Sequence, residues 1–492
     1  MLYGPELQTS WSGMSDPVVR VAFMTVIDGG DLDEENAAGH VHGICLKTGP
    51  PQRVGVELEW LVRDARDPAL PVPAGRIAAA VSAFDVVRGI PGHERRNENG
   101  NGSRHDGSEL PTSSSPGRLP SGALLTTEPG GQLELSSQPA DSLADLVRAT
   151  SADLVALRAE LAARGLELAG IGLDPLRPPR RVLTLPRYAA MEAFFDQGGP
   201  WGRQMMCGTA SVQVCLDAGD DSDGPSGYRR RWRLLHAMGP VLVGAFANSP
   251  LRDGKPTGWV SSRQQVWARM DPGRTRPPRL NGDPRAAWAA YALDARVMCV
   301  PDPDSADWSA PPGLTFRDWV LSGGGDSRLR RPTAEDLEYH LSTLFPPVRP
   351  RGHFELRMID AQRGDGWIVP LAVASALLSD DVASDAALAA AEPLWAGRSP
   401  GDEGPWVRAA RLGPADPATS RASRACFAAA RQALDRMSAP AAVTEAVDAF
   451  TDEYVSRDRC PADDLLEETR PRSPLAERGG TAELPVPISN GE

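Results

Sequence analysis

Four segments of the chain alternate apolar and polar residues with the two-residue period of a β-strand. In residues 53–62, for example, Val54, Val56 and Leu58 fall on one face while Glu57 and Glu59 fall on the other. The same division, with acids, amides or arginine on the polar face, recurs in residues 132–136, 210–218 and 353–362. A fifth segment, residues 166–175, is typical of a buried strand. These strands carry few of the lysines and threonines that an ordinary solvated face shows.

Longer segments repeat their apolar residues with helical spacing. The predicted helices are residues 31–47, 141–165, 228–250, 366–380, 383–392 and 420–455. The helix that starts at Asp141 or Ser142 has a capping residue there and a stop at Gly165. Strands and helices do not follow one another in a regular βαβ order. The pattern therefore predicts an α+β fold built on one mainly antiparallel sheet.

The domain organisation follows from composition. Residues 1–30 are expected to be weakly ordered, and residues 31–458 to form a single domain. Residues 88–122 are rich in Gly, Ser, Pro and Asn and are expected to be a disordered insertion within that domain. The polar, proline-rich residues 459–492 are expected to be a disordered tail.

A hairpin is predicted within the stretch TTEPGGQLELSSQ, residues 126–138, with its turn at residues 129–131. In that register Glu128 lies opposite Gln132 and Thr126 lies opposite Glu134, and opposed residues of a hairpin point the same way. If helices cover the apolar faces, the polar faces of all the strands form one floor. Five carboxylates would gather on it: Glu57, Glu59, Glu128, Glu134 and Glu355.

Carboxylates gathered in this way repel one another, which raises their pKa values unless a cation neutralises them. Oxygen ligands without His or Cys indicate Mg²⁺ or Mn²⁺ rather than zinc. For any single strand, a polar face that is simply solvated remains the simpler interpretation. The recurrence on four strands favours a ligand.

Arginines supply the opposite charge. Arg263, Trp267 and Arg274 fall in the stretch SSRQQVWARMDPGRT, and guanidinium groups suit a bidentate grip on carboxylate or phosphate. Carboxylates with a metal on one side and arginines on the other are typical of a phosphoryl-transfer site. The chain has no GxxxxGK[ST] loop, no complete dinucleotide fingerprint, no GxSxG and no HExxH.

Charge and cysteine content narrow the remaining classes. A formal net charge of −13 makes nucleic-acid binding through a broad basic face improbable on electrostatic grounds. The chain has only two lysines, and its six cysteines show neither zinc spacing nor a disulfide framework. No apolar run is long enough to cross a membrane, and residues 1–17 do not resemble a signal peptide, so a cytoplasmic location is expected. Met14 remains an alternative start.

Six motifs in chain order carry a resemblance to a known family. They are GVELEWLV, TTEPGGQLELSSQP, MMCGTASVQVCLD, FANSP, SSRQQVWARMDPGRT and TLFPPVRPRGHFELRMIDAQ. Together they resemble the plant and proteobacterial type of glutamate–cysteine ligase, and most of all its actinobacterial branch, which starts ergothioneine biosynthesis. The resemblance implies a catalytic fold like that of glutamine synthetase, in which a curved antiparallel sheet forms a funnel wrapped by helices.

The resemblance also implies the reaction and the residues. The substrates would be ATP, L-glutamate and L-cysteine, and the product γ-glutamylcysteine, formed through a γ-glutamyl phosphate. The five carboxylates would hold Mg²⁺, and Arg357 and Arg274 would contact the transferred phosphate. Arg263 would grip the glutamate α-carboxylate with Trp267 nearby. Gln132, Thr209 and Gln213 would contact substrate.

Three alternatives stay open from the sequence alone. The first is a γ-glutamyl ligase that uses another amine as acceptor. The second is a non-catalytic glutamate or nucleotide sensor on the same fold. The third is a structural protein whose sheet face is merely solvated. No protein partner can be inferred.

Overall fold

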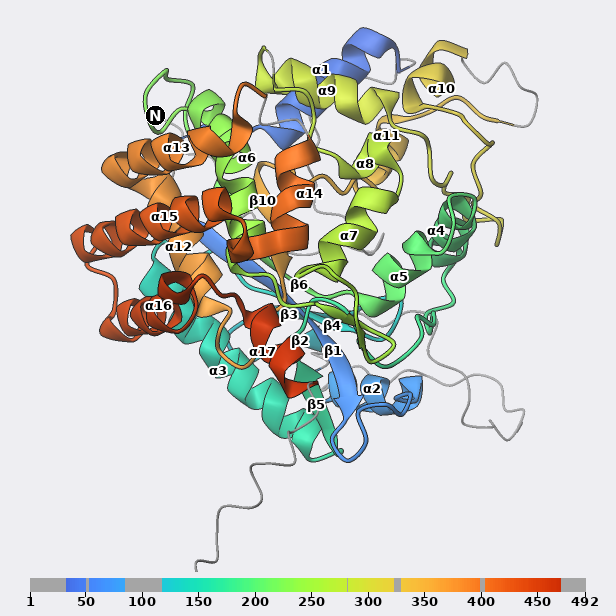
Figure 1. The fold of residues 1–492 in the computed structure, drawn as a ribbon. Helices are drawn as coiled ribbons and strands as arrows, with labels where there is room; N and C mark the ends of the chain where they lie inside the picture. Colours follow the sequence, from blue (N-terminus) through green and yellow to red (C-terminus); the bar gives the residue numbers. More distant parts are fainter. Residues whose placement is uncertain are drawn as a thin grey trace, which may run out of the picture.

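The core of the protein is an antiparallel sheet of eight strands, which lies among the helices at the centre of Figure 1. The computed structural model describes residues 32–49, 53–84, 117–280, 282–322, 329–398 and 403–469. Across the sheet the strands run β2 (Gly117–Arg118), β3 (Leu124–Thr127), β4 (Leu133–Ser136), β1 (Val54–Asp64), β6 (Ser211–Asp217), β10 (His353–Asp360) and β9 (Val348–Pro350). β5 (Leu166–Ala169) pairs with the last residues of β1, beyond the part that pairs with β4. The α+β antiparallel fold that the sequence predicts is confirmed.

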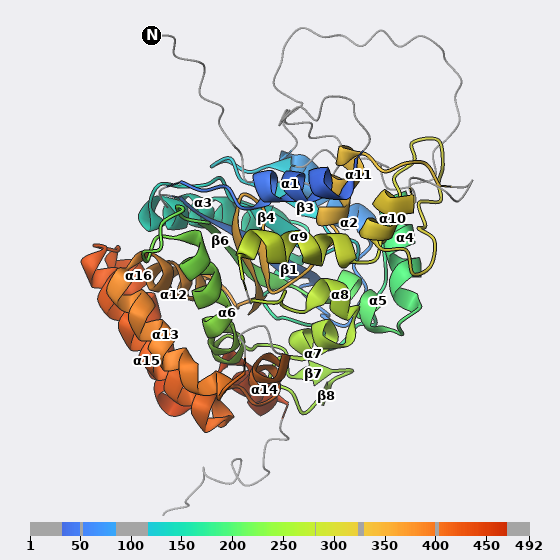
Figure 2. The same ribbon diagram turned by 90° about the horizontal axis from the view of Figure 1, so that it is seen from above.

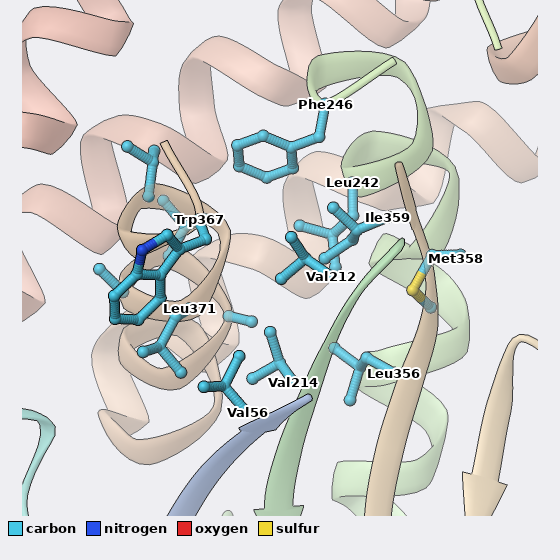
Figure 3. Packing of buried hydrophobic residues seen from close by; sticks show 14 of the residues in the cluster. Val56, Val212, Val214, Leu242, Phe246, Leu356, Met358, Ile359, Trp367 and Leu371 are labelled. Atoms are coloured by element: carbon cyan, nitrogen blue, oxygen red, sulfur yellow. The ribbon is translucent and has the colours of Figure 1, made fainter. Parts of the chain in front are cut away.

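One face of the sheet is apolar and packs under helices. Val56 on β1, Val214 on β6 and Leu356 on β10 are at most 1% exposed, and Figure 3 shows them facing Trp367 and Leu371. The helices of this layer are α3 (Leu143–Ala162), α6 (Tyr228–Ala245), α12 (Ile368–Ser379), α13 (Asp381–Trp395), α15 (Pro417–Arg436) and α16 (Ala441–Glu453). Burial of the alternating Val and Leu side chains therefore fixes which strand face turns away from this layer.

A second group of helices lies away from that layer, as Figures 1 and 2 show. It comprises α4 (Pro186–Asp196), α5 (Trp201–Gly208), α7 (Ser262–Arg269) and α8 (Pro272–Thr275), and α14 (Glu403–Leu412) connects it to the first layer by packing on both α6 and α7. A separate apolar cluster packs α4 and α5 against α7, with Tyr188, Met205 and Val266 among its buried members. A further cluster joins α1 (Glu34–Cys45), α9 (Pro284–Asp294), α10 (Phe316–Ser322) and α11 (Ala334–Leu341).

Several predicted elements are shorter or interrupted. The strand expected at 166–175 ends at Ala169, because the next residue meets another segment of backbone. A Cβ on Gly170 would lie 1.9 Å from the carbonyl oxygen of Gln362, so the chain passes there too closely for a side chain. The helix expected at 420–455 is two helices, α15 and α16, separated where Ser438 adopts a positive φ of 54°.

The predicted disordered segments are partly ordered. The tail expected from residue 459 contains helix α17 (Pro461–Glu468), which buries Ala462 and Leu465, so that prediction is wrong for these residues. The predicted insertion at 88–122 ends in β2, which pairs with β3. Its residues 88–116, the extension at 1–30 and the tail from 470 lie outside the described residues. The remaining described elements include α2 (Ala74–Val81) and the small hairpin of β7 (Leu251–Arg252) and β8 (Lys255–Pro256).

Candidate active site

The hairpin of β3 and β4 has the register that its sequence predicts. The backbone N–H of Glu128 donates to the carbonyl of Gln132 at 2.8 Å, and Thr126 pairs with Glu134. On the other side of β4, Glu134 lies directly opposite Glu59 of β1. Three carboxylates from three separate segments therefore turn toward one side of the sheet.

That side of the sheet forms the floor of a cleft of about 930 Å³, closed above by α4, α5 and α7. Residues named from the sequence that line the cleft are Glu57, Glu59, Glu128, Gln132, Glu134, Thr209, Arg263, Trp267 and Arg357. The structure thus brings together nine of the twelve residues that sequence reasoning selected. A polar face turned into a cleft under a second layer of helices is not an ordinary solvated sheet face.

Among the described residues, the nearby arginines do not outweigh the effect of burial on the carboxylates at the centre of the floor. Burial, together with the charge of Glu355, raises the pKa of Glu57 to about 7. Burial, together with the charge of Glu59, raises the pKa of Glu128 to about 7. The pKa of Glu134 is raised well above its ordinary value by burial and by Glu57. These enclosed carboxyl groups hold their protons near neutral pH. A cation that binds between them would release those protons.

Glu59 is held in place by neighbouring polar side chains. The Ser211 hydroxyl donates to it at 3.0 Å and the Gln213 amide donates at 2.8 Å. The oxygen of the Gln213 amide accepts from Arg357. Gln213 therefore joins the acidic half of the floor to the arginine half and is itself not part of the cleft lining.

Glu355, predicted as a metal ligand, lies below the cleft surface with no exposure and is bound by arginines. Arg349 donates to both of its oxygens, at 2.8 and 3.0 Å, and Arg357 donates as well. Burial alone would raise the pKa of Glu355, but Arg349 and Arg357 outweigh that effect and lower it well below the ordinary value. Its oxygens are thus already neutralised, and it positions arginines rather than facing the cleft.

Arg263 presents unused donors at the cleft. It is 1% exposed, and one of its terminal nitrogens donates to the carbonyl of Arg357 at 2.8 Å. Its Nε and its other terminal nitrogen have no hydrogen-bond partner, and the nearest carboxylate oxygen, on Asp360, is 3.9 Å away. Buried polar groups are nearly always paired, so these two donors indicate an anionic ligand. Trp267 lies beside the guanidinium, 5.5 Å from ring centre to Cζ.

Three further arginines line the cleft that sequence reasoning missed: Arg187, Arg349 and Arg351. Arg187 lies in the first turn of α4 and donates to the Ser342 hydroxyl at 3.0 Å. The sequence around Arg187 contains no motif that indicates a site, and the apolar residues of α4 do not form a clear helical pattern. Arg349 and Arg351 stand in the quoted motif TLFPPVRPRGHFELRMIDAQ, and their two-residue alternation, which Glu355 and Arg357 continue, is a signal that could have identified them.

Two predicted substrate contacts are used within the protein. The Gln132 amide donates to the carbonyls of Met206 and Thr209, at 3.2 and 3.0 Å, and accepts from the N–H of Gly130. The Thr209 hydroxyl donates to the carbonyl of Met205 at 2.6 Å. Both residues line the cleft, but their bonds fix the hairpin against the end of α5 rather than leaving the groups free for a ligand.

Arg274 is not brought to the cleft. It has no exposure and donates to the Thr343 hydroxyl at 2.9 Å and to the carbonyls of Thr343 and Arg296. Asp271 accepts from it at 3.3 Å. The predicted contact with a transferred phosphate therefore has no support in this geometry, because the guanidinium ties α8 to the segment after α11.

A preformed all-protein metal cage is not present. Within the described part of the chain, no three Asp, Glu, His or Cys side chains gather closely enough to hold one ion. Magnesium usually binds through one or two carboxylates and completes its shell with water and substrate phosphate. The donor set of the floor, carboxylates alone, fits that mode of binding and does not fit zinc.

An arginine-walled cleft over a carboxylate floor, on an α+β antiparallel fold, has the charges that suit anionic groups and a divalent cation. The family model described as Glutamate-cysteine ligase family 2 (GCS2) matches residues 53–483. The chain belongs to this glutamate–cysteine ligase family, and it is a ligase.

Relatives along the sequence agree with the family. The chain is 38% identical over 443 residues to the glutamate–cysteine ligase EgtA of Mycolicibacterium smegmatis, covering 88% of this chain and 90% of that protein. It is also 38% identical over 442 residues to EgtA of Mycobacterium tuberculosis, with the same coverage. A chloroplastic glutamate–cysteine ligase of Medicago truncatula is 32% identical over 248 residues, 49% of this chain and 47% of that protein.

Among solved structures, a glutamate–cysteine ligase from Francisella tularensis in complex with AMP aligns with a TM-score of 0.44 at 11% identity. That alignment covers 88% of this chain and 86% of that one. None of the described helices is both long enough and apolar enough to cross a membrane.

Proposed function

We propose that this ligase joins the γ-carboxylate of L-glutamate to the amine of L-cysteine with ATP, giving γ-glutamylcysteine, ADP and phosphate. The observation that carries the proposal is the cleft in which unneutralised carboxylates on the sheet face the buried, unpaired donors of Arg263. Family membership and the EgtA relatives support the same reaction. By the same similarity, we propose that the product supplies ergothioneine biosynthesis.

Mg²⁺ ions would be held by Glu57, Glu59, Glu128 and Glu134, with one or two of these carboxylates to each ion and with water and substrate phosphate as the other ligands. When bound, Mg²⁺ would neutralise phosphate oxygens and withdraw electron density from the group being transferred. The raised pKa values of Glu57 and Glu128 support this assignment, because only an added positive charge removes the cost of ionising them together. Ser211 and Gln213 keep Glu59 oriented by their hydrogen bonds.

Arg263 would hold the α-carboxylate of glutamate through its two unpaired nitrogens. Arg357 would face the transferred phosphate, because its Nε has no hydrogen-bond partner and it lines the same cleft as the carboxylates. Arg187, which lines the cleft and whose charge acts on Glu128, would receive a second carboxylate, that of the acceptor amino acid. Arg274 is omitted from this assignment because its donors are all engaged away from the cleft.

The chemistry needs no protein nucleophile. The glutamate γ-carboxylate attacks the terminal phosphorus of ATP and forms an acyl phosphate, with ADP as leaving group. The cysteine amine then attacks the acyl carbon, phosphate leaves, and the amine loses a proton. The thiols of Cys207 and Cys215 are unsuited to attack, since burial raises the pKa of Cys207 to about 12 and the pKa of Cys215 well above its ordinary value.

The test is phosphate release by the purified protein with Mg²⁺ and ATP. Release should require glutamate and cysteine together, and γ-glutamylcysteine should appear by mass spectrometry. A panel of acceptor amines separates this activity from a γ-glutamyl ligase of other specificity: equal turnover with L-alanine would contradict a cysteine acceptor. ATP and glutamate binding without product from any amine would show a sensor instead.

A further inference from the structure

A second cavity lies behind the inner wall of the cleft. Its empty space is about 560 Å³, counting the part open to solvent. It is lined by α7, α8, α14, β10 and residues 345–347. Trp267, Phe345 and Arg357 line both this cavity and the cleft, so the two spaces share one wall.

The walls of this second pocket are flat and apolar. Trp267 and Phe345 meet edge to face with ring centres 5.9 Å apart. Trp406 on α14 forms another wall and is fixed in place, because a Cβ on Gly239 of α6 would lie 1.9 Å from its indole ring. Pro346 and Pro347 add further rigid surface. Aromatic and proline walls of this kind favour a planar ring over a flexible chain.

The mouth of the pocket carries one charge of each sign. Arg276 on the turn after α8 and Glu403 at the start of α14 form an ion pair at 2.8 Å, with side chains 49% and 33% exposed. A pair so exposed contributes only about 0–1 kcal/mol, so a ligand can open it at small cost. A carboxylate would then meet Arg276 and an ammonium group would meet Glu403. The acid at the mouth also disfavours a phosphate-bearing ligand.

We propose that the second pocket binds a free amino acid with a flat, unsaturated side chain, whose ring enters between Trp267 and Trp406 and whose zwitterion meets Arg276 and Glu403. Because the shared wall includes Arg357, an occupied second pocket changes the surroundings of the phosphate-facing arginine. Binding itself does not depend on the proposed function. Only the effect on turnover rests on it.

Calorimetry on the full chain tests the binding, with L-phenylalanine, L-histidine and L-tryptophan as probes. At least one should bind with a Kd of about 1 mM or lower, as expected for a ligand of this size. Two analogues separate the charges: 3-phenylpropionate lacks the ammonium group, and phenethylamine lacks the carboxylate. Glu403→Gln should weaken binding of the amino acid about tenfold and leave binding of 3-phenylpropionate unchanged. Arg276→Gln should weaken binding of the amino acid by a similar factor and leave binding of phenethylamine unchanged.

A filled pocket is the structural control. Val407→Trp places an indole in the cavity and should abolish probe binding, whereas Leu412→Trp adds the same group on the exposed side of α14 and should not. Thermal unfolding shows whether both variants are folded. No binding by any of the three amino acids, or binding of AMP in their place, would overturn the proposal.

Turnover gives a separate reading. A bound amino acid should change kcat or the KM for glutamate in the unsubstituted protein and in Leu412→Trp, but not in Val407→Trp. If phosphate release fails altogether while the probe binds, the ligase assignment fails and the second pocket stands. If the probe competes with cysteine and becomes γ-glutamylated, it occupies the cleft, and the second pocket is refuted.

Discussion

Glu57 and Glu355 lie on the same polar side of the sheet, on the two strands that flank β6, and their surroundings act on them in opposite ways. Burial and a neighbouring acid raise the pKa of Glu57, whereas Arg349 and Arg357 lower that of Glu355. The floor is therefore divided into a half that lacks positive charge and a half that already has it. We expect a cation to neutralise the carboxylates of the first half and an anion to bind the arginines of the second.

The largest effect should come from Glu57→Gln. It removes a carboxylate from the half that needs a cation, so turnover should fall by at least about 100-fold, as measured by ADP release at saturating substrates. The matched control is Glu167→Gln, which makes the same change at an exposed position on β5 and should leave the rate unchanged. Full turnover by Glu57→Gln would contradict its role as a metal ligand.

Glu355→Gln should be the more damaging change to stability. It leaves Arg349 and Arg357 without their buried counter-charge, which should cost about 3–5 kcal/mol of unfolding free energy. Glu57→Gln should instead keep or raise the melting temperature of the metal-free protein, because it relieves repulsion. Denaturant unfolding of the two variants side by side measures the contrast. An equal loss of unfolding free energy in the two variants would contradict the division of the floor into two halves of different charge.

The pH dependence of stabilisation by Mg²⁺ sharpens the same comparison. The folded pKa of Glu57 is about 7 against an ordinary 4.5, so its contribution to stability is lost as pH rises through 7. Mg²⁺ binds the ionised form, and its effect on the melting temperature should grow from pH 6.5 to 8. Below pH 6.5 the buried His236 and His340, whose pKa values are lowered to about 4 and 3 by burial, destabilise the fold as the unfolded chain takes up protons. A shift with Mg²⁺ that is constant from pH 6.5 to 8 would contradict the assignment.

The smallest effect should come from Ser211→Ala. It removes one of the two hydrogen bonds that orient Glu59, at a cost of about 1 kcal/mol, and leaves Gln213 in place. The concentration of Mg²⁺ for half-maximal turnover should rise about threefold to tenfold with little change in kcat. A change in kcat alone would assign Ser211 to a different role.

Local pattern predicted the parts of the site that depend on strand geometry. Alternation placed Glu57 and Glu59 on one face, and the Pro-Gly-Gly turn set Glu128 against Gln132, as the structure confirms. Those predictions succeed because side-chain direction along a strand has a period of two that tertiary contacts rarely change. The prediction of a disordered tail is wrong at α17, because the local pattern there is too weak to indicate a helix. Its two buried residues, Ala462 and Leu465, are too few to show a helical pattern.

What the sequence by itself determined is which side chains share a strand face, the sign of the charges there and the family to which the chain belongs. Tertiary structure alone decided which of those charges remain available. In the sequence, Arg274 cannot be distinguished from Arg263, nor Glu355 from Glu57. In the structure, Arg274 donates hydrogen bonds to Thr343 and Arg296. Glu355 accepts hydrogen bonds from Arg349 and Arg357. The partners of Arg274 come from other segments of the chain, and those of Glu355 come from the neighbouring strand β9 and from β10 itself. Hydrogen bonding and burial, which set whether a charged group can meet a ligand, are properties of those contacts and not of local pattern.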